Sequence, residues 1–159
     1  MSDWFALVDG AQDPNLYPLV QRSAERQCLF AGAIDPAMAP ACPYLVRLDE
    51  REPLLPTWRQ HGTGRHWGML VESDLGLEPL RRLFRRFLQV RLPDGSAVMF
   101  RFYDPRVFAA YIAAAPLDQA AGWFNGVRQY VAEADGAQHS FRWRQGRLFD
   151  FDQPIGLAA

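Results

Sequence analysis

Three Asp-Pro pairs set the strongest limits on how this chain can fold: Asp13-Pro14, Asp35-Pro36 and Asp104-Pro105. An aspartate accepts hydrogen bonds from the free N–H groups at a helix start, and a proline at the first helical position loses none. We therefore expect helices after the first and third pairs. The second pair lies in residues 35–43, DPAMAPACP, where three prolines predict a surface loop because they can support neither a helix nor a strand ladder.

Apolar spacing predicts the elements between these breaks. The predicted strands are 4–9, 44–48 and 66–72, and the predicted helices run from Pro14 to about Arg26 and over 53–61. From Leu77 onward, apolar residues recur every three or four positions, with Arg82, Arg85 and Arg86 falling between them. This pattern predicts an amphipathic helix with a basic outer face.

The second half of the chain contains several turn signals. Residues 93–96, PDGS, predict a hairpin between strands 89–92 and 97–103, and Asp135-Gly136 and Gln145-Gly146 predict an antiparallel meander after a short helix over 117–125. The predicted class is α/β, more closely α+β, with a mixed β-sheet flanked by helices and an antiparallel C-terminal meander. We expect one domain over residues 1–153 and a flexible tail over 154–159.

Charge and cysteine content narrow the possible partners. The net charge is −1 and the pI is near 6.3, which gives no overall attraction to nucleic acid or to an anionic membrane. All seventeen basic residues are arginine, a bias typical of GC-rich bacterial genomes. Two isolated cysteines, a start without signal-peptide features, and a longest apolar run about half of the roughly 20 residues that span a bilayer favour a cytoplasmic protein without a membrane anchor.

Residues that could perform catalysis form only weak patterns. His61, His66 and His139 lack metal-ligand spacing, and the position of Ser73 between a strand and a helix suits a helix cap. The carboxylate pairs Asp150/Asp152 and Glu72/Asp74 have the spacing that places two acids on one face of a strand, as a hydrolase would need. We expect no cofactor and no metal, and we keep a small hydrolase that uses these acids as an alternative.

The basic helix offers a second alternative. Arg82, Arg85 and Arg86, with Arg81 beside them, have a spacing that could bridge phosphates of a nucleic acid. The net charge of the chain argues against that function. A solvated face, or a face that docks an acidic protein partner, accounts for the same residues.

The segment FRFYDPRVF, residues 100–108, is the most informative in the chain. Read as a strand, it directs Phe100 and Phe102 to the core, and Arg101 and Tyr103 to the opposite face. Asp104 then caps the following helix. Folding explains the phenylalanines and the cap, whereas Arg101, Tyr103 and Arg106 form an arginine and aromatic mixture that is enriched at protein interfaces.

Several segments together resemble a known family. They are ALVDGAQDPNLYPLV from Ala6, PYLVRL from Pro43, the long run WGMLVESDLGLEPLRRLFRRFLQVRLPDGSAVMFRFYDPRVFAAYI from Trp67, and WFNGV from Trp123. They are similar to the type VI secretion effector adaptor, or chaperone, family catalogued as domain of unknown function 4123. The most specific parts are the Asp-Gly after the first strand, the serine after the fourth, the PDG hairpin and the RFYDPR run.

The resemblance implies a non-enzymatic chaperone that binds a cognate toxin effector and helps to load it onto the VgrG spike of a contractile injection apparatus, in the cytoplasm of the donor cell. Some relatives continue into a further C-terminal lobe, which we expect this chain to lack beyond about residue 140. The partners expected are therefore the effector and VgrG, and not a nucleic acid or a membrane. The candidate partner-binding residues are Arg101, Tyr103, Asp104, Arg106, Arg82, Arg85 and Arg86.

Overall fold

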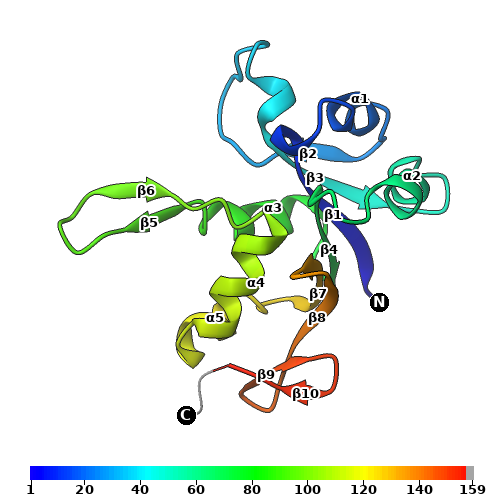
Figure 1. The fold of residues 1–159 in the computed structure, drawn as a ribbon. Coiled ribbons are helices and arrows are strands. Elements are labelled where there is room, and N and C mark those ends of the chain that lie inside the picture. Colours follow the sequence, from blue (N-terminus) through cyan, green and yellow to red (C-terminus); the bar gives the residue numbers. More distant parts are fainter. Residues whose placement is uncertain (157–159) are drawn as a thin grey trace.

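An eight-stranded sheet in the order β10-β9-β8-β7-β4-β1-β3-β2 forms the centre of the protein in a computed structural model that describes residues 1–156 (Figure 1). Its strands are β1 (Asp3–Asp9), β2 (Arg26–Cys28), β3 (Pro43–Leu48), β4 (Gly68–Ser73), β7 (Val127–Ala134), β8 (Ala137–Arg144), β9 (Arg147–Asp150) and β10 (Gln153–Pro154). Within the described residues, every strand pair in this sheet is antiparallel.

Helices cover both faces of this sheet. They are α1 (Leu16–Gln21), α2 (Leu54–His61), α3 (Leu77–Arg85), α4 (Pro105–Ala114) and α5 (Leu117–Gly122), with two 3-10 turns at Gly10–Gln12 and Ala39–Ala41. Central strand β1 shows why two layers are needed, because its residues alternate between the faces. Phe5 and Leu7 pack in the cluster with α3, α4 and α5, whereas Ala6 and Val8 pack in the cluster with α1 and α2.

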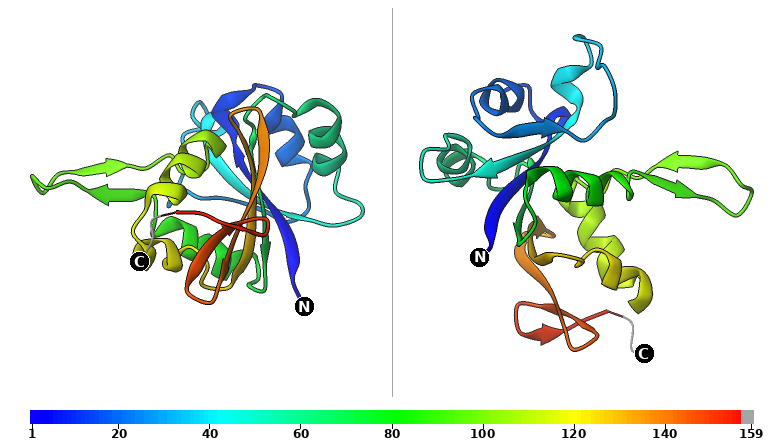
Figure 2. Two further views of the ribbon diagram at one scale, coloured as in Figure 1. Left: turned by 60° about the horizontal axis from the view of Figure 1, so that its bottom comes forward. Right: turned by 180° about the vertical axis from the view of Figure 1, so that it is seen from behind.

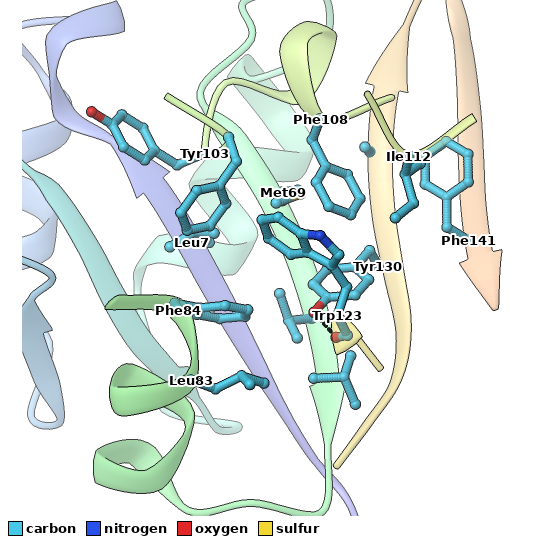
Figure 3. Packing of buried hydrophobic residues seen from close by; sticks show 14 of the residues in the cluster. Leu7, Met69, Leu83, Phe84, Tyr103, Phe108, Ile112, Trp123, Tyr130 and Phe141 are labelled. Carbon is cyan, nitrogen blue, oxygen red and sulfur yellow. Dashed lines mark hydrogen bonds between the residues drawn. The ribbon is translucent and has the colours of Figure 1, made fainter. Parts of the chain in front are cut away.

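The larger of the two clusters is rich in aromatic residues (Figure 3). Trp123, just after α5, lies between Phe102 and Phe108, with ring centroids 4.9 and 5.3 Å away. The hydroxyl of buried Tyr130 on β7 donates a hydrogen bond to the carbonyl of Trp123. Strand β7 is thereby joined to α5 by both packing and a satisfied polar group.

A long hairpin, β5 (Gln89–Arg91) and β6 (Ala97–Met99), forms a separate two-stranded sheet. It extends from the end of α3 and stands away from the rest of the protein in all three views (Figures 1 and 2). The hairpin turns at the Asp-Gly step, as the sequence predicted. Gly95 in this turn has φ +86°, a conformation that favours glycine. Every residue from Gln89 to Met99 is exposed.

The α+β class, the flanking helices and the C-terminal meander are confirmed, whereas the predicted mixed sheet is antiparallel throughout the described chain. The first helix is shorter than predicted because Arg26–Cys28 pairs with β3 as an edge strand. Pro154 pairs with Phe149, and Ile155 packs against the larger core cluster, although both were expected in the tail. Residues 157–159 of that tail lie outside the described residues.

Candidate interaction surface

Two buried carboxylates meet where β1 ends and α4 begins. Asp9, the last residue of β1, is fully buried and pairs with Arg101, whose guanidinium nitrogen lies 2.9 Å from its carboxylate. Asp104 is 8% exposed and accepts a hydrogen bond from the amide of Arg106, which makes it the N-cap of α4. The side-chain amide of Gln12 donates to both acids, at 3.0 Å to Asp9 and 3.2 Å to Asp104. These five residues form what we call the Asp9–Asp104 network.

Two arginines connect this network to solvent. Arg101 and Arg106 have side chains 50% and 51% exposed, although the acids that they bind are buried. Arg106 holds Asp104 through two guanidinium contacts, 3.1 and 2.9 Å long. The pair geometry is the bidentate arrangement that arginine favours with carboxylates. The surface of the network is therefore cationic and its interior is anionic.

The ionisation of Asp104 follows from these contacts. Burial by itself would raise the pKa of this carboxyl, but the hydrogen bonds from Arg106 and its positive charge outweigh burial and lower the pKa. Asp104 thus stays ionised when the protein is near neutral pH. It acts as a fixed hydrogen-bond acceptor for the start of α4 and for Gln12.

The structure corrects the predicted conformation of the RFYDPR run. Strand β6 ends at Met99, and the amide of Asp104 bonds to the carbonyl of Arg101, so the chain turns where a strand was predicted. Tyr103 is consequently 3% exposed and belongs to the larger core cluster (Figure 3). The guanidinium of Arg101 lies 5.7 Å from the centre of that ring. Tyr103 therefore packs against the guanidinium of Arg101 from inside the protein and has almost no exposed surface of its own.

The predicted site residues fall into two groups. Arg101, Tyr103, Asp104 and Arg106 come together around the Asp9–Asp104 network, as described above. Arg82, Arg85 and Arg86 are exposed on α3 and make no ion pair or side-chain hydrogen bond with any of residues 1–156. The predicted basic outer face of α3 is present, and its apolar face, with Leu80, Leu83 and Phe84, is buried as the spacing indicated.

Asp9 and Gln12 were not predicted as site residues. The only signal in the sequence was the Asp-Gly step after the first strand, which contributed to the resemblance but had no role assigned. The structure gives both residues of the step a role. Asp9 binds Arg101, and Gly10 lies so close to the 3-10 turn Ala39–Ala41 that a Cβ would be 2.5 Å from the carbonyl oxygen of Pro40.

The serine after β4 also has a structural role. Ser73 is fully buried; its hydroxyl donates to the carbonyl of Gly126 at 2.6 Å and accepts from the amide of Leu75 at 3.0 Å. We predicted a helix cap, but α3 begins later, at Leu77, with Gly76 as its N-cap residue. Ser73 instead fastens the turn before β7 to the end of β4.

The carboxylates of the hydrolase alternative each have a different partner. Glu72 accepts from Ser2 and Gln129, and hydrogen bonds from these two side chains lower its pKa. Asp74 pairs with Arg128 at 3.0 Å, and Asp152 with Arg144 at 3.1 Å. Three surface cavities, of about 360, 310 and 280 Å³, lie in the described part of the protein, and none of these acids lines them.

Asp150, the fourth of these acids, contacts His139 at 2.6 Å and accepts from the amide of Ser140. It likewise lines none of the three cavities. Residues 1–156 contain no group of three side chains arranged to hold a metal ion. In the same residues, no helix has the length and apolar character needed to cross a membrane.

A comparison with family models gives one match. Residues 4–122 match the model described as domain of unknown function (DUF4123). The matched range runs from β1 through α5, so it contains the Asp9–Asp104 network, α3 and the β5–β6 hairpin, and it ends before the β7–β10 meander. No curated protein and no solved structure matches the chain.

Proposed function

The chain belongs to the DUF4123 family, and from that premise we propose that it is an adaptor of type VI secretion that binds one cognate toxin effector and helps to load it onto the VgrG spike. The match over residues 4–122 carries this proposal, because the family is associated with such adaptors. The role proposed is non-catalytic. It needs only a stable surface that recognises another protein.

The geometry supports a protein partner. Arg101 and Arg106 are half exposed while their counter-ions are buried, which holds both guanidinium groups in fixed positions at the surface. Arginine held in this way loses less side-chain entropy on binding than a freely moving one, and arginine is enriched among residues that dominate interface energies. The net charge of −1 favours a protein over a polyanion such as nucleic acid.

The proposal is tested by co-expressing the chain with the toxin encoded beside it in the genome. We expect the two proteins to co-elute in size-exclusion chromatography, and the complex to bind the purified VgrG of the same gene cluster. Deleting the adaptor gene should stop delivery of that toxin and leave delivery of other effectors unchanged. A toxin that stays soluble, reaches VgrG and is delivered at the normal level without this chain would refute the adaptor function.

A further inference from the structure

The β5–β6 hairpin is a two-stranded sheet to which residues 1–156 add neither a third strand nor a covering helix. Four of the nine exposed large apolar residues among the described ones lie in it: Val90, Leu92, Val98 and Met99, which are 40–56% exposed. Figures 1 and 2 show it projecting from the end of α3 and away from the main sheet. Isolated two-stranded hairpins are only marginally stable in water, and long exposed edges usually invite pairing.

Both edges of the hairpin have backbone groups without a hydrogen-bond partner in the described part of the chain. The amide of Leu92 donates to the carbonyl of Ser96, and the amide of Phe100 donates to the carbonyl of Leu88. Hydrogen-bonded pairs alternate with non-bonded pairs along an antiparallel ladder, so the inward bonds of the hairpin belong to the pairs 88/100, 90/98 and 92/96. The amides of Gln89 and Arg91 therefore point outward on one edge, and those of Ala97 and Met99 on the other.

One face of the hairpin is apolar. Val90 and Val98 are directly opposite each other in the register, and Leu92 follows two residues later on the same face. Together Val90, Val98 and Leu92 form an apolar strip on this face. A third strand beside the hairpin could extend the strip with apolar side chains of its own. The strip is 40–42% exposed at each of its three residues.

The charge around the hairpin selects the chemistry of the partner. Residues 82–101 contain five arginines and one aspartate, a net charge of +4, so the rest of the chain carries −5. Arg82, Arg85 and Arg86 are exposed and form no ion pair within residues 1–156, and Arg91 bonds only to the carbonyl of Gly95. Asp94, the single acid, is held by Ser96. A second copy of this chain would bring like charges together, whereas an acidic segment would neutralise them.

We propose that the β5–β6 hairpin is the docking element for the effector, and that an extended segment of the effector, carrying acidic and apolar side chains, adds to one edge of the hairpin as a third strand. This inference rests on the adaptor function proposed above. Backbone hydrogen bonds to the outward amides supply part of the affinity, and the apolar strip and the α3 arginines supply the selectivity.

Proline substitutions at outward-facing amides test the strand addition directly. Ala97→Pro and Gln89→Pro each remove one donor from one edge and leave the bonds within the hairpin intact. We expect one of the two substitutions to weaken binding of the effector at least tenfold, and so to identify the edge used. Arg26→Pro is the matched control: Arg26 lies on β2, the end strand of the main sheet, and because Gln27 is the bonded residue there, the amide of Arg26 also faces outward. It should leave the affinity unchanged.

Charge reversal tests the chemistry of the segment. The double variant Arg85→Glu/Arg86→Glu should lower the affinity at least tenfold at low salt and flatten its dependence on salt concentration. Arg147→Glu is the control, because Arg147 on β9 is exposed and, like the two α3 residues, has no ion pair in the described structure. Hydrogen exchange of the complex should show new protection at the amides of the edge that the proline scan identifies. Circular dichroism verifies that each variant is folded.

The outcomes separate this inference from the adaptor function. A wild-type chain that binds no effector overturns both. A wild-type complex that survives both hairpin prolines and the charge reversal overturns only the hairpin assignment, as does a loss of binding in Arg26→Pro alone. Hairpin-dependent binding to phosphatidylserine vesicles, or a self-association that the hairpin prolines abolish while effector binding persists, also overturns it, because the hairpin would then serve a membrane or a second copy.

Discussion

The guanidinium of Arg101 lies 2.9 Å from the carboxylate of Asp9, although 92 residues separate them in the chain. Asp9 ends the central strand β1, and Arg101 follows the hairpin strand β6 after one residue. Their ion pair therefore fastens the base of the projecting hairpin to the middle of the main sheet. Asp9 is fully buried, and its carboxylate accepts hydrogen bonds from Arg101, from Gln12 and from the amide of Ala11.

Replacing Arg101 should destabilise the protein. A buried charge that loses its partner typically costs about 3–5 kcal/mol. Because Asp9 keeps its bonds to Gln12 and Ala11, we expect Arg101→Met to lower the free energy of unfolding by about 3 kcal/mol, measured by urea denaturation. The double variant Asp9→Asn/Arg101→Met should recover part of that loss, because it no longer buries an unpaired charge.

Arg128→Met is the control for this measurement. Arg128 and Asp74 form an ion pair of similar length, 3.0 Å, but their side chains are 54% and 47% exposed. Exposed pairs contribute about 0–1 kcal/mol. If Arg101→Met lowered the free energy of unfolding no more than Arg128→Met does, the Arg101–Asp9 pair would contribute no more to stability than an exposed ion pair.

Substitution of Gly10 tests the second half of the Asp-Gly step. A Cβ at this position would lie 2.5 Å from the carbonyl oxygen of Pro40 and 2.6 Å from that of Cys42, both of them backbone atoms that cannot rotate away. Overpacking of this kind costs about 1–3 kcal/mol, so Gly10→Ala should lower the melting temperature clearly. In Gly122→Ala the new methyl group meets no atom within 4 Å, and a helix gains about 0.5–1 kcal/mol from alanine. Equal effects of the two substitutions would contradict the close approach at Gly10.

Local patterns were sufficient to predict much of this fold. The strand at β1, the apolar face of α3, the Asp-Gly hairpin and the Asp104 cap all follow from residue patterns over a few positions, and each is present. Strand β2 was missed because its three residues carry too little pattern to outweigh the preceding helix signal, and it forms only through pairing with β3. The pairing of β7 with β4 was also not predictable from local pattern, because it joins distant parts of the chain.

The candidate site was predictable only in part for the same physical reason. The sequence indicated Arg101, Asp104 and Arg106 because they are close together in the chain. It could not reveal that Asp9 and Gln12 complete the network, since both contacts span 92 residues. Tyr103 was assigned to the wrong face because a strand period was extended through a turn, and the burial of its ring came from packing that no local pattern records.

The stability contributed by Asp104 should depend on acid pH. Its pKa in the folded protein is lowered from the usual value of 3.8, the hydrogen bonds and charge of Arg106 exceeding the opposite effect of burial. A lowered pKa means that the contribution is complete above the unfolded pKa, near pH 4, and is lost as the pH falls through the folded pKa. The free energies of unfolding of the wild type and Asp104→Asn, measured from pH 6 to 2, should therefore differ most at pH 6 and converge at low pH. Parallel curves would contradict a lowered pKa.

His139 should give the opposite dependence. Its Nδ1 lies 2.6 Å from Asp150, and its Nε2 lies 3.2 Å from the carbonyl oxygen of Ala134. Both partners are acceptors, so both contacts can be hydrogen bonds only when the ring carries two protons. The hydrogen bond to Asp150 is the main cause of a pKa raised above the usual 6.5, against the smaller opposing effect of burial. Its contribution to stability is then complete below pH 6.5 and is lost as the pH rises through the folded pKa.

An NMR titration of the His139 ring protons measures this pKa directly. We expect a value above 6.5 in the wild type, and a value closer to 6.5 in Asp150→Asn, because the amide keeps an acceptor oxygen but lacks the charge. A His139 pKa of 6.5 or below in the wild type would show that the contact with Asp150 does not hold the proton on the ring.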